Sequence, residues 1–306
     1  MKKFTFIDLF AGIGGIRLGF ESVGGACVFS SEWDKSAQKT YAANFGEIPH
    51  GDITQIDVTA IPKFNILLAG FPCQPFSNAG LKKGFEDTRG TLFFDIARIV
   101  KHHKPEVVFL ENVKSLASHD KGNTLKVIVQ TLEDIGYTVY HKILNARDFG
   151  SNQNRPRIYI VAFKDKIDFE FPNQVIGPTM PLLFILQKDV DTKYTISDKL
   201  WAGHQRRKLQ HQAKGNGFGY RLFNKYYEYT STLSARYYKD GSEILIEQEG
   251  KNPRKLTPRE CARLQGFDDN FIIPVSDCQA YKQFGNSVYV PIVCKIARQI
   301  VKTLNF

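Results

Sequence analysis

The sequence predicts an α/β protein in which a mostly parallel, Rossmann-like sheet is joined to a smaller, irregular, β-rich domain. Through residue 163, short apolar segments typical of strands alternate with segments whose apolar residues recur at helical spacing. A glycine-rich turn, Gly12-Ile13-Gly14-Gly15, follows the first strand. Beyond residue 163 the alternation stops, and the sequence becomes polar and rich in glycine and tyrosine. The first part therefore predicts a sheet covered by helices on both faces.

The N-terminal elements follow from these local patterns. A strand over residues 4–10 enters the glycine turn, and the turn opens a helix over about 16–23. A second strand, 27–31, ends at Glu32-Trp33, and a helix follows over about 35–44. The apolar run 65–69 indicates a short buried strand. A glycine and two prolines after it force a turn, which ends the strand.

The later elements complete the sheet and begin the second domain. Apolar residues at helical spacing predict helices beginning near Leu92 and Thr124, and apolar runs predict strands over 105–113, 139–144 and 157–163. Short strand-like pieces are expected over 230–238 and 242–247. Thr257, Pro258 and Glu260 match an N-cap, a first-turn proline and a capping box, which predicts a helix there. An apolar stripe over 291–304 predicts a last helix that packs on the N-terminal sheet.

These elements predict two domains. The first comprises residues 1–180 and is completed by the C-terminal segment 279–306. The second comprises residues 181–278. Pro172, Pro178 and Pro181 mark the change of composition between them.

The bulk composition narrows the class of protein. The 306 residues are 42% hydrophobic and 24% charged, and no apolar run approaches the roughly 18 residues that a membrane span needs. We therefore expect a cytoplasmic protein without membrane segments. Five scattered cysteines without a CxxC pair predict neither a disulfide framework nor a metal site.

The net charge of +10 is concentrated in one segment. Residues 193–263 hold fifteen Lys and Arg residues against seven Asp and Glu residues, together with many tyrosines and phenylalanines. Basic residues interleaved with aromatic ones are typical of surfaces that bind nucleic acid. A solvated basic face is the alternative for this segment taken alone.

A reaction site is predicted where two strands end. Cys73 lies in the run Gly70-Phe71-Pro72-Cys73-Gln74-Pro75-Phe76-Ser77, directly after one strand. Glu111 ends the next predicted strand of the sheet. Ligands of open α/β sheets bind at the carboxyl ends of the strands, so a nucleophile and an acid meet at this edge. A buried structural cysteine is the alternative, against which the flanking prolines argue.

A cofactor pocket is predicted at the same edge. A strand, a glycine turn and a helix are typical of nucleotide binding, although the glycines do not spell GxGxxG. Glu32 follows Gly12 by twenty residues, where a carboxylate can accept hydrogen bonds from ribose hydroxyls. Trp33 can stack on a purine, and Asp52, expected at the end of a third short segment, can contact an adenine edge.

Six segments in one order resemble the cytosine-C5 DNA methyltransferases. They are 6–15, Pro72-Cys73-Gln74, Glu111-Asn112-Val113, 153–157, 256–267 and 283–288. The N-terminal half and residues 84–92 are most similar to the small bacterial enzymes that methylate the inner cytosine of GCGC. The resemblance fades between residues 163 and 254.

The resemblance implies S-adenosylmethionine as cofactor. Phe10 would stack on adenine, Glu32 would hold the ribose, and the glycine turn would let the backbone approach the methionine part. The residues implied for this pocket are Phe10, Ala11, Gly12, Gly14, Gly15, Glu32, Trp33, Asp52, Ile53, Gly70, Pro72, Leu92, Asn286 and Ser287.

The same resemblance implies the catalytic residues. Cys73 would add to C6 of the cytosine, and Glu111 would hydrogen-bond N3 and the exocyclic amine. Arg155 and Arg157 are the candidates to hold the cysteine as a thiolate, and the family assigns one of them to the cytosine carbonyl and the surrounding backbone.

Double-stranded DNA is the implied partner, with a flipped target base. Residues 80–90 would form a lid, and the second domain would recognise the target sequence. The implied DNA-binding residues are Gln74, Ser77, Lys82, Lys83, Arg89, Arg206, Arg207, Arg221 and Arg236. Ala79 departs from the serine that similar enzymes carry in this loop.

The leading hypothesis is a monomeric methyltransferase of a restriction-modification system, linked functionally to an endonuclease. Two alternatives stay open: the tRNA-directed branch of the same family, and a catalytically silent DNA-binding regulator. An NAD-dependent oxidoreductase is disfavoured because GxGxxG is missing.

Overall fold

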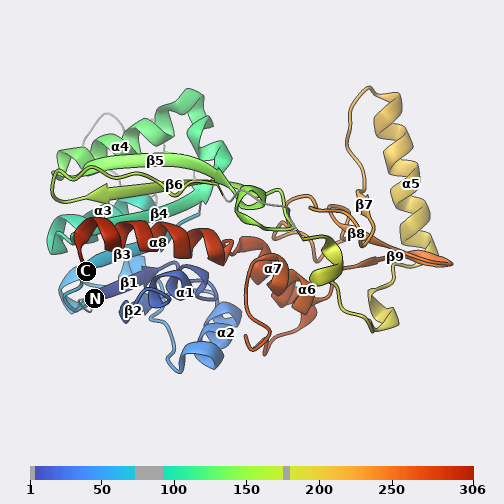
Figure 1. Cartoon of the computed structure of the whole chain (residues 1–306), viewed down its shortest axis with the longest axis horizontal. Coiled ribbons are helices and arrows are strands. Elements are labelled where there is room, and N and C mark those ends of the chain that lie inside the picture. The colour runs from blue at the N-terminus through green and yellow to red at the C-terminus, as the bar shows by residue number, and fades with distance from the viewer. Residues whose placement is uncertain (1–3, 73–91, 175–179) are drawn as a thin grey trace. The chain divides into compact units, whose positions relative to one another are not determined.

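The computed structural model describes residues 4–72, 92–174 and 180–306, which form two compact units (Figure 1). Unit 1 is made of Met1–Leu144, Pro156–Asn173 and Pro291–Phe306. Unit 2 is made of Asn145–Arg155 and Gln174–Val290.

Unit 1 contains a six-stranded sheet with the strand order β2-β1-β3-β4-β6-β5. Strands β2, β1, β3 and β4 pair in parallel, and β6 is antiparallel to β4. The strands are β1 Thr5–Leu9, β2 Ala26–Ser31, β3 Ile66–Gly70, β4 Val107–Val113, β5 Thr138–Asn145 and β6 Pro156–Phe163. The predicted fold class, an α/β domain with a mostly parallel sheet and a second, smaller sheet, is confirmed.

Helices cover both faces of this sheet (Figure 1). They are α1 Gly15–Glu21, α2 Lys35–Phe45, α3 Leu92–His103, α4 Asn123–Asp134 and α8 Val290–Leu304. Successive side chains of a strand point to opposite faces. Ile7 therefore joins one apolar cluster with Ile96 of α3 and Ile128 of α4. The other face of β1 presents Phe6 to Phe20, whose rings lie 6.1 Å apart.

The predicted C-terminal helix packs as expected. A Cβ atom added to Gly19 of α1 would lie 2.4 Å from Cγ1 of Val293, so α1 and α8 approach closely. Burial of alternate apolar side chains on both faces stabilises unit 1, at about 25 cal/mol per Å² of apolar surface.

The turn between β1 and α1 has a left-handed backbone. Phe10 has φ 54°, Gly12 has φ 56° and Gly14 has φ 83°. Glycine adopts this conformation without a steric cost, whereas Phe10 adopts it under strain. A Cβ atom at Gly14 would also lie 2.2 Å from the ring of Phe45. The turn therefore requires glycine at this position.

Unit 2 contains a three-stranded sheet, β7-β8-β9, in which β7 is parallel and β9 antiparallel to β8. Its elements are α5 Asp198–Ala213, β7 Leu222–Phe223, β8 Leu245–Gln248, β9 Lys251–Lys255, α6 Pro258–Leu264 and α7 Asp277–Asn286. The capping box of α6 is confirmed: Glu260 N donates to Thr257 Oγ1 at 3.1 Å, and Thr257 N donates to Glu260 Oε2 at 2.8 Å.

One strand prediction for unit 2 is wrong. Between residues 230 and 238 only Thr230 makes a β-bridge, to Gln153, and residues 235–240 form turns. Tyr237 is buried there, and its hydroxyl donates to Ile244 O at 2.6 Å and accepts from Leu256 N at 2.8 Å. Side-chain hydrogen bonds replace a strand ladder.

The division into units also differs from the expected domain boundaries at 180 and 279. Residues 145–155 and 279–290 group with unit 2. Asn152 Nδ2 donates to Glu228 O at 2.7 Å, and Gln265 Nε2 donates to Phe284 O at 2.6 Å. These contacts between residues distant in sequence draw both segments into unit 2.

A search of the described helices finds none with the length and apolar character needed to span a bilayer.

Candidate functional site

The carboxyl ends of β3 and β4 lie side by side in unit 1. Gly70, at the end of β3, is in register with Glu111 of β4. Asn112 Nδ2 donates a hydrogen bond to Phe71 O at 2.8 Å, so the chain is fixed where it leaves β3. Pro72 follows, and Cys73 is the next residue. Glu111 thus stands beside the backbone that leads to Cys73.

Glu111 is oriented by an arginine from the neighbouring antiparallel strand. Arg157 of β6 places Nε 3.3 Å from Glu111 Oε1, and both side chains are largely buried. Arg157 Nη1 also donates to Pro156 O at 2.8 Å. The antiparallel pairing of β6 with β4 puts this guanidinium next to the carboxylate.

Several predicted site residues lie outside the described residues. They are Cys73, Gln74, Ser77, Ala79, Lys82, Lys83 and Arg89. The description resumes at Leu92, a half-buried residue that begins α3.

The glycine turn and the end of β2 meet through Glu32. Gly12 N donates to Glu32 Oε2, and Asp34 N donates to Oε1, each at 2.8 Å. Burial raises the pKa of Glu32, and the two backbone donors oppose that shift. Ala11 N donates to Ser31 O at 2.9 Å, which joins the turn to β2. Phe10, Gly12, Glu32 and Trp33 thus gather at the carboxyl ends of β1 and β2.

These residues fit a nucleoside-containing cofactor. A carboxylate has about four lone-pair sites, and two backbone donors leave acceptor capacity on Glu32 for ribose hydroxyls. Among the described residues, no atom lies within 4 Å of a Cβ built on Gly12, so they leave open space beside this backbone. The Trp33 side chain is 74% exposed and can cover a flat ring.

The sequence predicts Asp52 at the end of a strand, but the structure does not place it there. It caps the 3-10 helix η1 Ile53–Gln55, and its Oδ1 accepts from Thr54 N at 3.0 Å. Ile53 is buried, and its carbonyl accepts from Arg98 Nη2 of α3 at 2.5 Å. Asp52 follows an isolated bridge between His50 and Ser31, so it still lies near the end of β2.

Asp8 is a residue that sequence reasoning missed. It lies on β1 between Ser30 and Leu68 of the neighbouring strands and is fully buried. Neither carboxylate oxygen has a hydrogen-bond partner within the described ranges. Burial raises the pKa of Asp8 well above its usual value, although the charge of Arg17 lowers it. A lone acid inside an apolar strand was the available signal in the sequence.

Arg155 has a different environment from Arg157, two residues away. In unit 2 its Nη1 donates to Leu233 O at 2.8 Å, and Nη2 donates to Gly285 O at 2.9 Å and to Ser287 O at 2.5 Å. The side chain is buried. Arg155 therefore joins three segments of unit 2, including Asn286 and Ser287 at the end of α7.

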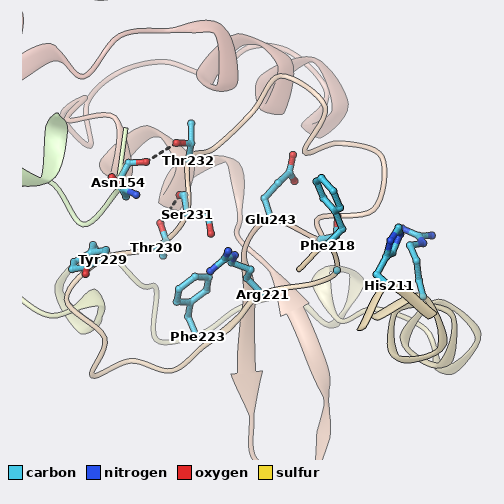
Figure 2. A pocket seen from close by; sticks show the side chains of 13 residues that line it. Asn154, His211, Phe218, Arg221, Phe223, Tyr229, Thr230, Ser231, Thr232 and Glu243 are labelled. Carbon is cyan, nitrogen blue, oxygen red and sulfur yellow. Dashed lines mark hydrogen bonds between the residues drawn. The ribbon is translucent and has the colours of Figure 1, made fainter. Parts of the chain in front are cut away.

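Unit 2 contains a cavity of about 650 Å³ (Figure 2). Donors, acceptors and rings line it together, among them Arg207, His211, Phe218, Arg221 and Glu243. Of the four arginines predicted to contact DNA in this domain, Arg207 and Arg221 line the cavity. Arg206 and Arg236 are exposed and do not line it.

Two of the remaining cysteines, Cys27 and Cys261, are in surroundings that disfavour their thiolates. Cys27, Cys261, Cys278 and Cys294 are free thiols. Burial raises the pKa of Cys27 to about 12, and it raises that of Cys261 well above the ordinary value. The thiolate forms of Cys27 and Cys261 are therefore disfavoured. In the described ranges, no three His, Cys, Asp or Glu side chains gather as metal ligands.

A sequence model of the family described as C-5 cytosine-specific DNA methylase matches residues 4–302. The chain is 62% identical over 309 residues to the Type II methyltransferase M.SsoII of Shigella sonnei, covering 99% of this chain and 81% of that protein. It is 63% identical over 306 residues to the Type II methyltransferase M.NlaX of Neisseria lactamica, covering 99% and 97%.

Solved structures share the fold. The Entamoeba histolytica methyltransferase EhMeth superimposes with a TM-score of 0.80 at 21% identity, over 99% of both chains. The S. pombe Dnmt2 methyltransferase superimposes with a TM-score of 0.81 at 21% identity, over 99% of this chain and 100% of that one.

Proposed function

This chain belongs to the C-5 cytosine-specific DNA methylase family, and we propose that it works through a covalent bond between Cys73 and C6 of the cytosine. It is a DNA methyltransferase that transfers a methyl group to C5 of cytosine, with S-adenosylmethionine as cofactor. The observation that supports the covalent route is the register of β3 with β4, which sets Glu111 beside the chain entering Cys73.

The chemistry requires a nucleophile because C5 of cytosine is a weak carbon nucleophile. When the Cys73 thiolate adds to C6, the electrons of the C5–C6 double bond move onto C5, which then takes the methyl group. S-adenosylmethionine supplies that methyl from a sulfonium. Loss of the C5 proton and expulsion of the Cys73 thiolate restore the aromatic ring.

Glu111 is the proposed partner of the base at N3 and the exocyclic amine. Proton donation to N3 offsets the charge that develops as the thiolate adds, and such help accelerates reactions by about 10²–10⁴-fold. Arg157, at 3.3 Å, holds the carboxylate in place. Arg155 joins segments of unit 2 through its three carbonyl contacts, so we propose for it a positioning role within that unit.

Glu32 and the glycine turn form the proposed binding site of the cofactor. The carboxylate would accept the ribose hydroxyls, Phe10 and Trp33 would cover the adenine, and Asp52 and Ile53 would lie beside it. Gly70, Pro72, Leu92, Asn286 and Ser287 are the other proposed wall residues.

The test is methyl transfer from labelled S-adenosylmethionine to plasmid DNA. Cys73→Ser should abolish it, whereas a matched change at an inert thiol, Cys278→Ser, should not. Methylation by Cys73→Ser at the wild-type rate would contradict the covalent route. DNA containing 5-fluorocytosine should form a lasting adduct with the wild-type protein only, which also excludes a catalytically silent regulator.

The biological setting is proposed from the relatives, which are named Type II methyltransferases. We infer that the enzyme protects host DNA from a linked restriction endonuclease and acts as a monomer on double-stranded DNA. Competition between tRNA and duplex DNA for labelled methyl groups tests the substrate. Light scattering of the pure protein tests the oligomeric state.

A further inference from the structure

The cavity of unit 2 contains polar atoms without partners. Glu243 Oε2 and His211 Nδ1 are both buried, and neither has a hydrogen-bond partner in the part of the chain that the structure describes. Buried polar groups in folded proteins are almost always hydrogen-bonded to protein or water. Both residues line the cavity, and because these two atoms are closed to solvent in this conformation, a side-chain rotation would let a bound molecule supply the missing hydrogen bonds.

Glu243 is held in one orientation. The Ser234 hydroxyl donates to Glu243 Oε1, and the same hydroxyl accepts from Arg236 N at 3.1 Å. The residue before Ser234 is fixed in turn, because Leu233 N donates to Gln153 Oε1 at 2.8 Å. One carboxylate oxygen is thus engaged while the other keeps its acceptor capacity. Figure 2 shows Glu243 between Ser231 and Phe218.

Arg221, directly before β7, pairs with the backbone on either side of Glu243. Arg221 N donates to Ser242 O, and Leu245 N donates to Arg221 O, each at 2.9 Å. Within the part of the chain that the structure describes, no ion pair joins Arg221 to Glu243. A cationic donor and an anionic acceptor therefore line one cavity without neutralising each other.

A G·C base pair matches this pair of groups. In the major groove guanine presents the acceptors O6 and N7, and cytosine presents the N4 amine as a donor. Arginine pairs with the guanine acceptors, and glutamate accepts from the cytosine amine. An A·T pair presents the O4 acceptor of thymine, which repels a carboxylate.

We propose that Glu243 determines target specificity by accepting a hydrogen bond from the N4 amine of a cytosine whose paired guanine is contacted by Arg221. This inference rests on the proposed function, since it concerns the DNA that the enzyme methylates. It assigns to unit 2 a base-reading carboxylate in addition to its arginines.

The first experiment maps the target by bisulfite sequencing of a plasmid methylated by the wild-type enzyme. Synthetic duplexes then carry A·T in place of each G·C pair of the site, except the methylated one. For Glu243→Ala and Glu243→Gln we expect kcat/KM on the cognate duplex to fall roughly 10- to 100-fold. At one G·C pair the preference over A·T should disappear, while the preference at all other pairs persists.

A second experiment removes the amine from the DNA and leaves the protein intact. The cytosine of that pair is replaced by 2-pyrimidinone, which lacks the N4 amine. On this duplex kcat/KM of the wild-type enzyme should fall by the same factor. For Glu243→Ala, kcat/KM should be the same on this duplex as on the cognate one, because the two changes remove one interaction. Glu247→Ala, at an exposed position of β8, the strand that follows Glu243, is the matched control and should keep wild-type discrimination.

Three outcomes overturn the assignment. They are unchanged discrimination at every pair, an equal loss on all duplexes by a folded variant, and loss of discrimination at an A·T pair of the site instead of a G·C pair. If the variants do not fold, the 2-pyrimidinone duplex decides with the wild-type enzyme, since full activity on it contradicts the proposal. Absence of methylation by the wild-type enzyme on any DNA would overturn the proposed function itself.

Discussion

Each unit contains a buried pair of one arginine and one glutamate, and the two pairs differ in their surroundings. In unit 1, Arg157 Nε lies 3.3 Å from Glu111 Oε1 at the strand ends, beside the backbone that leads to Cys73. In unit 2, Arg254 makes two contacts with Glu260, at 2.7 and 2.8 Å. Glu260 also accepts hydrogen bonds from the backbone N–H groups of Gln187 and Thr257, each at 2.8 Å.

The difference separates the carboxylate that we propose to be reactive, Glu111, from a structural one, Glu260. Glu260 is fully buried and is surrounded by donors that are all part of unit 2. Glu111 instead lies at the edge where ligands of α/β sheets bind. In the proposed mechanism, the same two residue types therefore serve catalysis at one place and the stability of the fold at the other.

The largest expected effect is on catalysis by Glu111→Gln. Because the amide cannot donate a proton to N3, the methylation rate should fall about 10²–10⁴-fold. The shape of the side chain is conserved, so the free energy of unfolding should change less than for Glu260→Gln. Single-turnover transfer of labelled methyl groups measures the rate, with the exposed Glu133→Gln as control. A rate within twofold of the wild type would contradict the proposed role of Glu111.

The next effect is on stability by Glu260→Gln. The change leaves the buried charge of Arg254 without its counter-ion, which should lower the free energy of unfolding by about 3–5 kcal/mol. The chain has two tryptophans, Trp33 in unit 1 and Trp201 in unit 2. In a Trp33→Phe background, urea unfolding followed by fluorescence therefore reports on unit 2.

The matched control for Glu260→Gln removes an exposed pair. Asp269 contacts Arg263 at 2.7 Å on the surface, and Asp269→Asn should cost about 0–1 kcal/mol because solvent screens such pairs. Equal costs for the two substitutions would mean that the buried pair contributes no more than a surface one. That result would remove the distinction between the two regions.

A third, smaller effect concerns the pH dependence of stability at Asp8. Burial raises its pKa in the folded protein, whereas an unfolded Asp titrates near ~3.9. Its favourable contribution is therefore complete below that pH and is lost as the pH rises through the folded pKa. The loss amounts to at most about 1.4 kcal/mol per pH unit for one proton.

Asp8→Asn should remove this loss. Urea unfolding of the two proteins between pH 4 and 8 should show the variant gaining stability relative to the wild type as the pH rises. Asp134→Asn, at an exposed position of α4, should follow the wild-type curve. Parallel curves for Asp8→Asn and the wild type would show that Asp8 titrates normally in the fold.

Local patterns predicted much of unit 1. The strands and helices are within a few residues of their expected bounds, because each is encoded by a contiguous run of apolar residues with the appropriate period. The capping box of α6 was predicted for the same reason, since its hydrogen bonds join Thr257 to Glu260 within one helical turn. The turns at 235–240 were missed because the buried Tyr237 is held by hydrogen bonds to Ile244 and Leu256, which no local pattern encodes.

The sequence by itself determined that Glu111 lies beside the end of β3, because parallel strands joined by a helix end at the same edge of a sheet. Only the tertiary structure decided that Arg155 and Arg157 have different partners. Arg155 contacts Gly285, 130 positions away, and Arg157 contacts Glu111 through an antiparallel pairing. The same holds for the cavity that brings Arg221 beside Glu243. Such contacts depend on how distant segments meet, and no local period of the sequence encodes that meeting.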